Sequence, residues 1–476
     1  MSGTHAAALR RADEELARSP GGADPWRPLF HYTAAKGWIN DPNGLVHFGG
    51  RYHMFSQHYP YSGEWGPMHW GHADSSDLLA WRRLPVALAP SEPYDLTMGC
   101  WSGSAVADGD RLSLVYTSAT GAKAERQAVC VATSPAGGEF VKHPKNPVIP
   151  GPPEGFTSDF RDPRAFRYGN AWRVVVGASR AGKGCVLLYE SPDLASWRLL
   201  GVLAESDGSL GHMWECPDLF PLGERWVLVV SPMGVPGVGS MALLGRLEDS
   251  GARFVIEETR VLDFGPDFYA PQTMEGPAGR RILIGWMDHW KSPDPPTLAS
   301  GWRGAMTVPR VLRPGPGGRG LAIEPVEELK SWRHEGGDIA VGGKFCAGAA
   351  DIEVELSAEK GSNGRLEMTL RGSPDGTRGV SLAWSAATGE VLLDPSRSGP
   401  AARKPCRMTA PARGGKLRLR AVLDRCSVEV FAGSPPDSVL SCLVFPAPGD
   451  DYLSVAVTGN GLRMAAFRAW KLAPPR

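Results

Sequence analysis

Between residues 31 and 313 the chain alternates short apolar runs with clusters of Gly, Pro, Asp and Asn, and this rhythm constrains the fold more than any other feature. Apolar runs of strand length occur at residues 111–116, 171–176, 225–230 and 281–286. Residues 76–81 (SDLLAW) are echoed by residues 191–197 (SPDLASW), each before an apolar stretch. Repeated four-strand units of this kind are typical of a β-propeller, whose axial funnel gathers residues from several blades. The sequence therefore predicts an all-β fold in which acids far apart along the chain can meet.

Alternating strands also dominate the chain from about residue 345 onward, at 351–356, 365–370, 417–423 and 453–458. No catalytic constellation occurs there, so we expect a β-sandwich packed on the first domain, with a structural role. Residues 314–318 (PGPGG) are expected to form a hairpin or loop. Residues 325–333 are expected to form a helix, with a proline in the first turn and two glutamates following.

The N-terminal residues 1–20 contain no apolar run that could serve as the core of a signal peptide. Leu9, Ala12 and Leu16 fall at helical spacing, which predicts a short amphipathic helix packed on the domain. We therefore divide the chain into an N-terminal extension (1–26), a propeller domain (27–335) and a sandwich domain (336–476).

Composition is that of a neutral chain of 476 residues, in which Lys+Arg and Asp+Glu both count 51. This balance gives no reason to expect a nucleic acid or an anionic membrane as a partner, and no segment reaches transmembrane length. The eight cysteines form no Cys-x-x-Cys pair, which predicts reduced thiols in a cytoplasmic protein. The histidines lack metal-ligand spacing, so we expect no metal.

Residues 37–44 (GWINDPNG) place Asp41 in a tight turn beside a tryptophan and two amides. Proline fixes its own φ, and Asn-Gly supplies the positive φ values that turns require. A lone aspartate in such a turn most often bonds its own backbone. The alternative is a rigidly held carboxylate that acts as a nucleophile or binds sugar hydroxyls, and two further acidic motifs favour it.

The two further motifs are residues 160–163 (FRDP) and residues 213–218 (MWECPD), which carry Asp162 and Glu215. Arg161 and Asp162 alone would be interpreted as a locally bonded charge pair. Glu215 is more unusual, because glutamate is rarely placed among large apolar neighbours without a purpose. An apolar surround would raise its pKa and make it a general acid. Three such acids suit glycosidic cleavage, with a nucleophile, an acid/base and a group that orients the sugar.

Together these motifs resemble the three signatures of glycoside hydrolase family 32, which contains invertases, sucrose-6-phosphate hydrolases, inulinases and levanases. The matching motifs lie at residues 38–44, 161–163 and 215–216. Further resemblance is found at residues 52–57, 69–73, 100–105, 267–273 and 423–431, so it runs from about residue 30 to the end.

The resemblance implies a five-bladed propeller followed by a sandwich, and it implies a role for each acid. Asp41 would attack the anomeric carbon of a terminal β-fructofuranosyl unit, Glu215 would be the acid/base, and Asp162 would hold fructosyl hydroxyls and stabilise the transition state. Retention by double displacement would follow, with the two catalytic carboxyls about 5 to 5.5 Å apart. No cofactor is implied. Other matched positions would line the fructose pocket: Asn40, Gln57, Trp65, Trp101, Ser102 and Arg161.

Substrate choice is less constrained by the sequence. Ser56 and Trp101 depart from the commonest family pattern, which puts leaving-group preference in doubt but touches no catalytic acid. A cytoplasmic location favours sucrose or sucrose 6-phosphate over long fructans, and a phosphate would call for a basic residue at the funnel rim. Arg180, Lys183 and Lys291 are loop candidates for that residue, each as readily interpreted as a plain surface charge.

Other functional classes remain open at this point. A fructosyltransferase or an exo-fructanase would keep the same three acids, and a non-catalytic sugar-binding propeller would keep the same fold. In some family members the sandwich domain makes oligomer contacts, so a homodimer is a further alternative.

Overall fold

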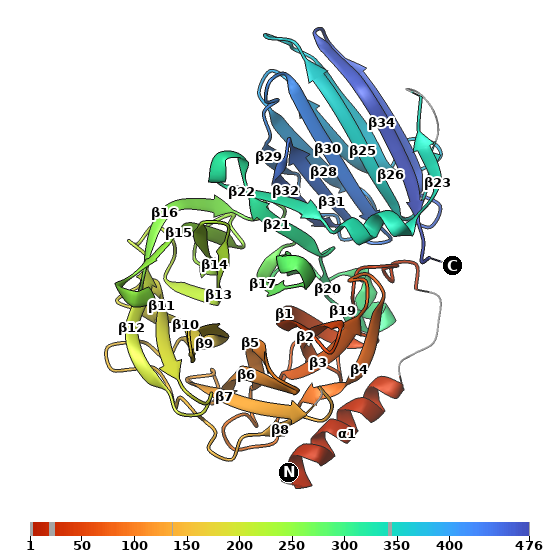
Figure 1. The fold of residues 1–476 in the computed structure, drawn as a ribbon. Coiled ribbons are helices and arrows are strands. Elements are labelled where there is room, and N and C mark those ends of the chain that lie inside the picture. The colour runs from red at the N-terminus through yellow and green to blue at the C-terminus, as the bar shows by residue number, and fades with distance from the viewer. Residues whose placement is uncertain (1–2, 19–23, 136, 341–344, 476) are drawn as a thin grey trace.

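The computed structural model describes residues 3–18, 24–135, 137–340 and 345–475. These residues form an all-β molecule of two parts, with one α-helix, α1 (Gly3–Ala17), among them. Figure 1 shows a ring of small sheets below and two larger stacked sheets above it. The N-terminal part is propeller-like and the C-terminal part is a β-sandwich, so the all-β prediction is confirmed.

The ring consists, in the described chain, of five sheets that follow one another in sequence order. The first two sheets contain β1 (Gly37–Phe48), β2 (Arg51–Tyr59), β3 (His69–Ser75) and β4 (Trp81–Leu88), then β5 (Gly99–Asp108), β6 (Arg111–Thr120), β7 (Arg126–Pro135) and β8 (Val141–Lys142). The third contains β9 (Phe160–Tyr168), β10 (Ala171–Arg180), β11 (Lys183–Ser191) and β12 (Arg198–Glu205). The fourth contains β13 (Met213–Leu222), β14 (Arg225–Met233), β15 (Met241–Glu248) and β16 (Arg253–Val261). The fifth contains β17 (Tyr269–Glu275), β18 (Arg281–Met287), β20 (Ala305–Met306), β21 (Arg310–Pro314) and β22 (Leu321–Pro325).

The ring is closed by pairing between its first and last segments. Strand β19 (Trp302–Arg303) runs parallel to β1, with Gly37 opposite Trp302 and Trp38 opposite Arg303. Since β19 follows the fifth sheet's β18 and joins the first sheet, the two ends of the domain hold each other. This closure removes a free sheet edge at that point.

The echoed sequences form the same turn in two different sheets. Asp77, between β3 and β4, accepts hydrogen bonds from the backbone N–H groups of Leu79 and Ala80. Asp193, between β11 and β12, accepts equivalent bonds from Ala195 and Ser196. The residue that follows each turn aspartate, Leu78 or Leu194, has a positive φ (67° and 65°). The repeat therefore marks one structural position of a repeated unit.

Two six-stranded sheets form the sandwich, and their facing apolar side chains make one continuous core. One sheet contains β23 (Arg333–Asp338), β34 (Leu462–Leu472), β25 (Ala350–Ala358), β30 (Lys416–Asp424), β31 (Ser427–Gly433) and β32 (Pro436–Leu443). The other contains β24 (Phe345–Cys346), β33 (Tyr452–Thr458), β26 (Arg365–Gly372), β27 (Gly379–Ser385), β28 (Glu390–Arg397) and β29 (Cys406–Thr409). The strands predicted at 351–356, 365–370, 417–423 and 453–458 all lie within these elements.

Helix α1 lies outside the ring beside β4 (Figure 1). Leu9 and Ala12 are buried in a small cluster with Val86 and Ala89, and Leu16 packs against its edge. The Asp13 carboxylate also accepts a hydrogen bond from the Val86 N–H at 2.9 Å. The apolar stripe of the helix is thus used to attach it to the first sheet.

The predicted helix at residues 325–333 is only partly correct. Residues Glu327–Trp332 form the 3₁₀ helix η5, whereas Pro325 pairs with Arg310 in a ladder and Arg333 pairs with Leu472. Because the residues on both sides are paired in strands, only a short helix can form between them. The other short helices are η1 (Asp249–Gly251), η2 (Pro277–Gly279), η3 (Pro296–Ser300) and η4 (Pro316–Gly318), the last forming the predicted turn between β21 and β22.

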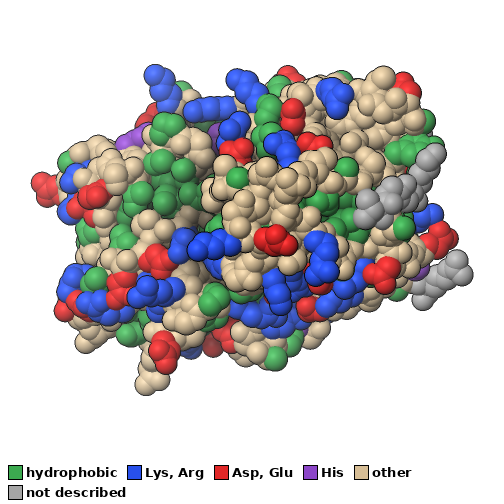
Figure 2. All heavy atoms as spheres, turned by 90° about the horizontal axis from the view of Figure 1, so that it is seen from above, with side chains coloured by type: hydrophobic (Ala, Val, Ile, Leu, Met, Phe, Trp, Pro, Cys, Tyr) green, Lys and Arg blue, Asp and Glu red, His purple; other side chains and the backbone are tan. Residues whose placement is uncertain are grey.

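The surface carries charges of both signs. On the face seen in Figure 2, Lys and Arg side chains are interspersed with Asp and Glu, in keeping with the zero formal charge of the chain. Within the described segments, no helix is long and apolar enough to cross a membrane.

Candidate active site

The first strand of each ring sheet lies innermost in Figure 1, and these strands carry the predicted site residues or their contacts. The pairing register shifts in every one of them beside a site residue. The shifts fall between Ile39 and Pro42 on β1, Trp101 and Gly103 on β5, and Glu215 and Asp218 on β13. On β9 and β17 the displaced residues are 162–163 and 270–271. Bulges of this kind turn side chains away from the regular pleat.

Proline is the sequence signal for four of these bulges. It follows Asp41, Asp162, Cys216 and Ala270, and a residue without an N–H is tolerated where ladder pairing is interrupted. Asp162, Cys216 and Ala270 also have positive φ values of 64°, 50° and 48°. Such conformations cost about 1–3 kcal/mol each and cluster at functional sites.

The bulged strands surround a cavity of about 390 Å³. All nine residues predicted from the sequence line it: Asn40, Asp41, Gln57, Trp65, Trp101, Ser102, Arg161, Asp162 and Glu215. Residues far apart in the sequence meet here: Asp41 and Cys216, for example, are in contact although 175 positions separate them. The ring of sheets is what makes this convergence possible.

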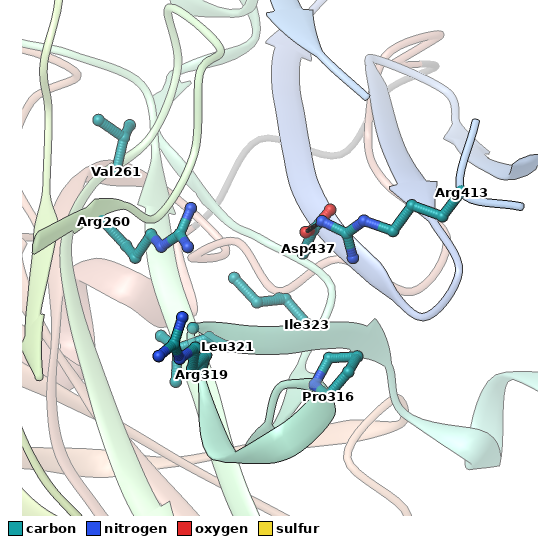
Figure 3. A pocket seen from close by; sticks show the side chains of 9 residues that line it. Arg260, Val261, Pro316, Arg319, Leu321, Ile323, Arg413 and Asp437 are labelled. Atoms are coloured by element: carbon teal, nitrogen blue, oxygen red, sulfur yellow. Dashed lines mark hydrogen bonds and ion pairs between the residues drawn. The ribbon is translucent and has the colours of Figure 1, made fainter. Parts of the chain in front are cut away.

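A different cavity of about 260 Å³ lies where the sandwich meets the ring, and Figure 3 shows it. Arginines 260 and 319 from the ring and Arg413 from the sandwich surround it, and Arg413 is paired with Asp437. Since its lining includes a single carboxylate that is already ion-paired, it lacks the two acids that glycosidic cleavage requires. The axial cavity is therefore the candidate active site.

Asp41 is buried, with 8% of its surface exposed. The Ser102 hydroxyl donates to Oδ2 at 2.6 Å and the Asn40 amide donates to Oδ1 at 2.9 Å. Burial raises the pKa of Asp41 although these two bonds oppose the shift, and the charge of Glu215 adds to it. The carboxylate is thus fixed in orientation and close to a second acid.

Asp162 lies next to Asp41 through a shared neighbour, Cys216. The Cys216 N–H donates to Asp162 Oδ2 at 2.9 Å, and the Cys216 thiol lies 3.5 Å from that oxygen and 3.6 Å from Asp41 Oδ2. Burial raises the pKa of Asp162 to about 7; Arg161 opposes the shift, and the charges of Glu215 and Asp41 reinforce it. Three carboxylates therefore line one cavity, and two of them, Asp41 and Asp162, are buried.

Glu215 has two polar partners. Arg161 donates to Oε1 at 3.0 Å, and the Tyr269 hydroxyl donates to Oε2 at 2.5 Å. The expectation of an apolar surround is wrong: Trp214 packs into the core between the third and fourth sheets, and Cys216 turns toward the aspartates. Successive side chains on a strand project to opposite faces, so sequence neighbours need not surround one another.

The remaining predicted residues support or border the acids. Asn40 accepts a bond from Trp38 Nε1 at 2.7 Å while donating to Asp41, and Gln57 donates to the Cys100 carbonyl at 3.0 Å. Trp65 is 36% exposed and meets Trp101 edge-on, with ring centroids 6.4 Å apart. These indoles offer apolar faces of the kind on which sugar C–H surfaces stack.

Sequence reasoning missed several residues of the cavity. Met98, Lys123, Ala124, Gln127, Asp159 and Trp290 line it, and Tyr269 contacts Glu215 from just outside. Asp159 accepts a hydrogen bond from Arg161 at 2.7 Å. Its position two residues before Arg161 is the sequence signal that could have identified it as a site residue. Lys123 and Trp290 lie on loops between strands, where the strand pattern carries no signal. Within the described residues, no group of three His, Cys, Asp or Glu side chains is placed to hold a metal ion.

Three carboxylates that meet at the axis of a propeller-like domain provide the groups that a glycoside hydrolase requires. Residues 31–325 match the glycosyl hydrolases family 32 N-terminal domain, and residues 328–471 match the family 32 C-terminal domain. The chain belongs to glycosyl hydrolase family 32.

Similar proteins cover nearly the whole chain. A sucrose-6-phosphate hydrolase of Escherichia coli is 38% identical over 94% of both chains. A raffinose invertase of Escherichia coli is 42% identical over 94% of this chain and 95% of that protein. The solved GH32 β-fructofuranosidase of Bombyx mori is 32% identical, with a TM-score of 0.85 over 99% of both chains. A mutant of the Bombyx mori enzyme has been solved in complex with sucrose.

Proposed function

We propose that this chain hydrolyses the terminal β-D-fructosyl bond of sucrose, sucrose 6-phosphate or both, with retention of configuration. The observation that carries the proposal is the meeting of Asp41, Asp162 and Glu215 in one cavity, each presented by a bulged inner strand. Family membership supports the same reaction class. A distance of about 5 to 5.5 Å between the Asp41 and Glu215 carboxyls is the expectation for a retaining enzyme.

In the first step Asp41 attacks the anomeric C2 of the fructosyl unit, and the bond from C2 to the bridging oxygen breaks. Glu215 transfers its proton to that oxygen, so the glucosyl part leaves as a neutral alcohol. Bonds from Ser102 and Asn40 hold the attacking carboxylate in place, which reduces the cost of orienting it. The product of this step is a fructosyl ester of Asp41.

In the second step Glu215 accepts a proton from water, and the resulting nucleophile attacks C2. The ester bond to Asp41 breaks, the carboxylate is regenerated, and fructose leaves with its original configuration. Tyr269 and Arg161 keep Glu215 aimed at the same position in both steps. Asp162 binds fructosyl hydroxyls and stabilises the positive charge that develops in each transition state.

We assign this chemistry to residues 27–335 and interpret their five sheets as the five blades of a propeller. We propose residues 336–476 as the sandwich domain, whose strand β23 already begins at Arg333, and residues 1–26 as the N-terminal extension. All eight cysteines are free, which supports a reducing compartment, the cytoplasm. Light scattering of the purified chain measures its mass in solution and so tests whether it forms a homodimer.

The leaving group is expected on the Glu215 side of the cavity, because Glu215 must reach the bridging oxygen. A further cavity of about 610 Å³ adjoins there, sharing Glu215 and Trp290 with the catalytic cavity and bordered by Lys291 and His289. Of the three basic candidates from the sequence, Lys291 alone borders either cavity. Arg180 is instead paired with Glu205 at 2.6 Å.

A substituent on the 6-position of the leaving glucose would therefore enter a space bordered by an ammonium group. The relatives named for sucrose 6-phosphate and raffinose suggest that such substituents occur in this family. Initial rates of fructose release from sucrose, sucrose 6-phosphate and inulin test substrate choice. Phosphate recognition by Lys291 is supported if the enzyme prefers the phosphorylated sugar and this preference weakens in Lys291→Gln. The control variant Lys183→Gln should keep the wild-type preference.

The same assay separates hydrolysis from transfer. Equal release of glucose and fructose as sucrose concentration rises supports a hydrolase. A growing excess of glucose with oligosaccharide products would indicate a fructosyltransferase. Activity on none of the three sugars would contradict the proposed function.

A further inference from the structure

One arginine of the sandwich domain reaches the ring behind the active site. Arg403 lies on the loop between β28 and β29, is 5% exposed, and donates through Nε to both oxygens of Asp267 at 3.0 and 3.1 Å. Its Nη2 lies 3.4 Å from Asp288 Oδ1. Both aspartates belong to the ring and are fully buried. A single guanidinium therefore joins two buried carboxylates of the other domain.

The first carboxylate precedes the residue that binds Glu215. Asp267 stands two positions before Tyr269, whose hydroxyl donates to Glu215 Oε2. Besides Arg403, Asp267 accepts from the Leu443 N–H of the sandwich at 2.8 Å and from the Ser292 hydroxyl at 3.3 Å. The start of β17 is thus held by the sandwich, and Tyr269 is held with it.

The second carboxylate leads to Asp41. Asp288 accepts from Arg303 Nε at 3.1 Å, and the Arg303 guanidinium lies 4.9 Å from the centre of the Trp38 ring. Trp38 in turn donates to Asn40, which donates to Asp41. Each contact in this series is direct.

We propose that Arg403 is a positioning residue through which the C-terminal domain sets the placement of both catalytic carboxylates. Without its guanidinium, two buried carboxylates would face each other with less compensation, since Asp288 keeps Arg303 but Asp267 keeps neutral donors only. Buried like charges repel, so the segments around 267 and 288 would shift. These segments carry Tyr269 and Trp290. The proposal rests on the roles given above to Asp41 and Glu215.

The test compares Arg403→Lys with Arg420→Lys. Arg420 is also a largely buried sandwich arginine, and it binds one carboxylate, Asp351, through two bonds of 2.8 Å. Asp351 lines neither the catalytic cavity nor the adjoining cavity of about 610 Å³. Lysine keeps the charge but cannot bridge two acids with a planar fork. We expect kcat per folded molecule on sucrose to fall about 10- to 100-fold in Arg403→Lys with KM little changed, and to stay near the wild-type value in Arg420→Lys.

A double-mutant cycle shows whether the effect passes through Tyr269. If it does, Arg403→Lys lowers kcat by a smaller factor in a Tyr269→Phe background than in the wild type, because the contact from Tyr269 to Glu215 is already lost there. Asp288→Asn keeps the side-chain shape and tests the series of contacts that leads from Asp288 through Arg303 and Trp38 to Asp41. It replaces Arg403→Lys as the test variant if Arg403→Lys does not fold. We expect a similar fall in kcat.

A wild-type kcat in folded Arg403→Lys would overturn the proposal. If Arg403→Lys does not fold, a wild-type kcat in Asp288→Asn would overturn it instead. Full additivity of the effects of Arg403→Lys and Tyr269→Phe on kcat would also overturn it. A lowered melting temperature with unchanged kcat would show a structural role alone and overturn it equally. Failure of the wild-type chain to release fructose would instead contradict the proposed function. The two failures are therefore distinguishable.

Discussion

The axial cavity and the cluster of His31, Asp424 and Glu429 at the domain interface both bury carboxylates, but the carboxylate pKa values shift in opposite directions. In the cavity, burial raises the pKa of Asp162 to about 7 and also raises that of Asp41. At the interface Asp424 and Glu429 are fully buried too, yet each has a lowered pKa. The difference lies in the partners and not in the depth of burial.

In the interface cluster both Asp424 and Glu429 face several donors, among them the protonated His31 ring. Although burial alone would raise its pKa, Asp424 accepts from the His31 ring at 2.8 Å and from the N–H groups of Leu29 and Phe30. Glu429 accepts from Arg310 at 2.5 Å and from the other ring nitrogen of His31 at 2.8 Å. In the cavity, acids instead face one another. Asp424 and Glu429 therefore stabilise the folded chain, whereas Asp41 and Asp162 keep buried negative charge at a cost in stability, in the cavity that is proposed to bind the substrate.

Replacing Glu215 should give the largest change in activity. Glu215→Gln removes the proton that the leaving oxygen requires, so kcat on sucrose should fall by about 10²–10⁴-fold or more. The melting temperature should stay near that of the wild type. Glu205→Gln, which alters a partly exposed pair with Arg180, is the matched control and should retain activity. An unchanged rate in Glu215→Gln would remove this residue from the mechanism.

Breaking the interface network should have the opposite signature. Glu429→Gln leaves Arg310 and His31 short of a buried counter-charge, so the free energy of unfolding should drop by about 3–5 kcal/mol. The kcat of the remaining folded enzyme should change little. Urea unfolding measures the loss, and Glu324→Gln, in an exposed pair with Arg313, should cost about 1 kcal/mol or less. Equal losses in both variants would refute the assigned role of the network.

The histidine of the network predicts how stability varies with pH. Burial alone would lower the pKa of His31, but its bonds to Asp424 and Glu429 raise it to about 9. Because the folded pKa lies above the unfolded value of about 6.5, this contribution is complete below pH 6.5 and disappears as pH rises through 9. Melting temperatures of the wild type should fall across that range, and His31→Gln should flatten the dependence. A slope of the same size in His31→Gln would assign it to other groups.

The cavity acids predict a separate effect on activity. Since the pKa of Asp162 is raised to about 7, its charge is lost as pH falls through that value. We expect kcat/KM on sucrose to decline on the acid side of neutrality, by up to about tenfold per pH unit. The acids titrate together, so the apparent value belongs to the cluster. In Asp162→Asn the rate should be lower throughout and the acid limb displaced; an unmoved limb would exclude Asp162 as its source.

The smallest effect is expected at the rim. Trp65 is partly exposed and offers one face of the cavity. Trp65→Ala should raise KM for sucrose by about tenfold, equivalent to about 1.4 kcal/mol, with a smaller change in kcat. Trp226→Ala, on β14 and not among the residues that line the cavity, controls for loss of an indole in general. A larger fall in kcat than rise in KM would place Trp65 nearer the reacting atoms.

The sequence was most informative where local chemistry and function coincide. The prolines after Asp41 and Asp162 mark bulges as well as acids, and the turn aspartates at 77 and 193 mark repeated sheets. Contacts between distant strands left no such mark. The bond from Tyr269 to Glu215 and the reach of Arg403 into the ring depend on how domains and blades pack. The helix at 325–333 was overestimated because flanking strand pairs, invisible in the local pattern, limit it to six residues.

The most direct test of the central claim is a joint measurement of turnover and melting temperature in Asp41→Asn. Asparagine keeps the shape of the side chain but cannot form the fructosyl ester. Our account predicts that fructose release from sucrose falls by at least about 10³-fold, while the melting temperature stays the same or rises, because a buried charge has been removed. Retained turnover would contradict the nucleophile assignment. Loss of the folded state would show that Asp41 belongs with Asp424 and Glu429, as a carboxylate on which the fold depends.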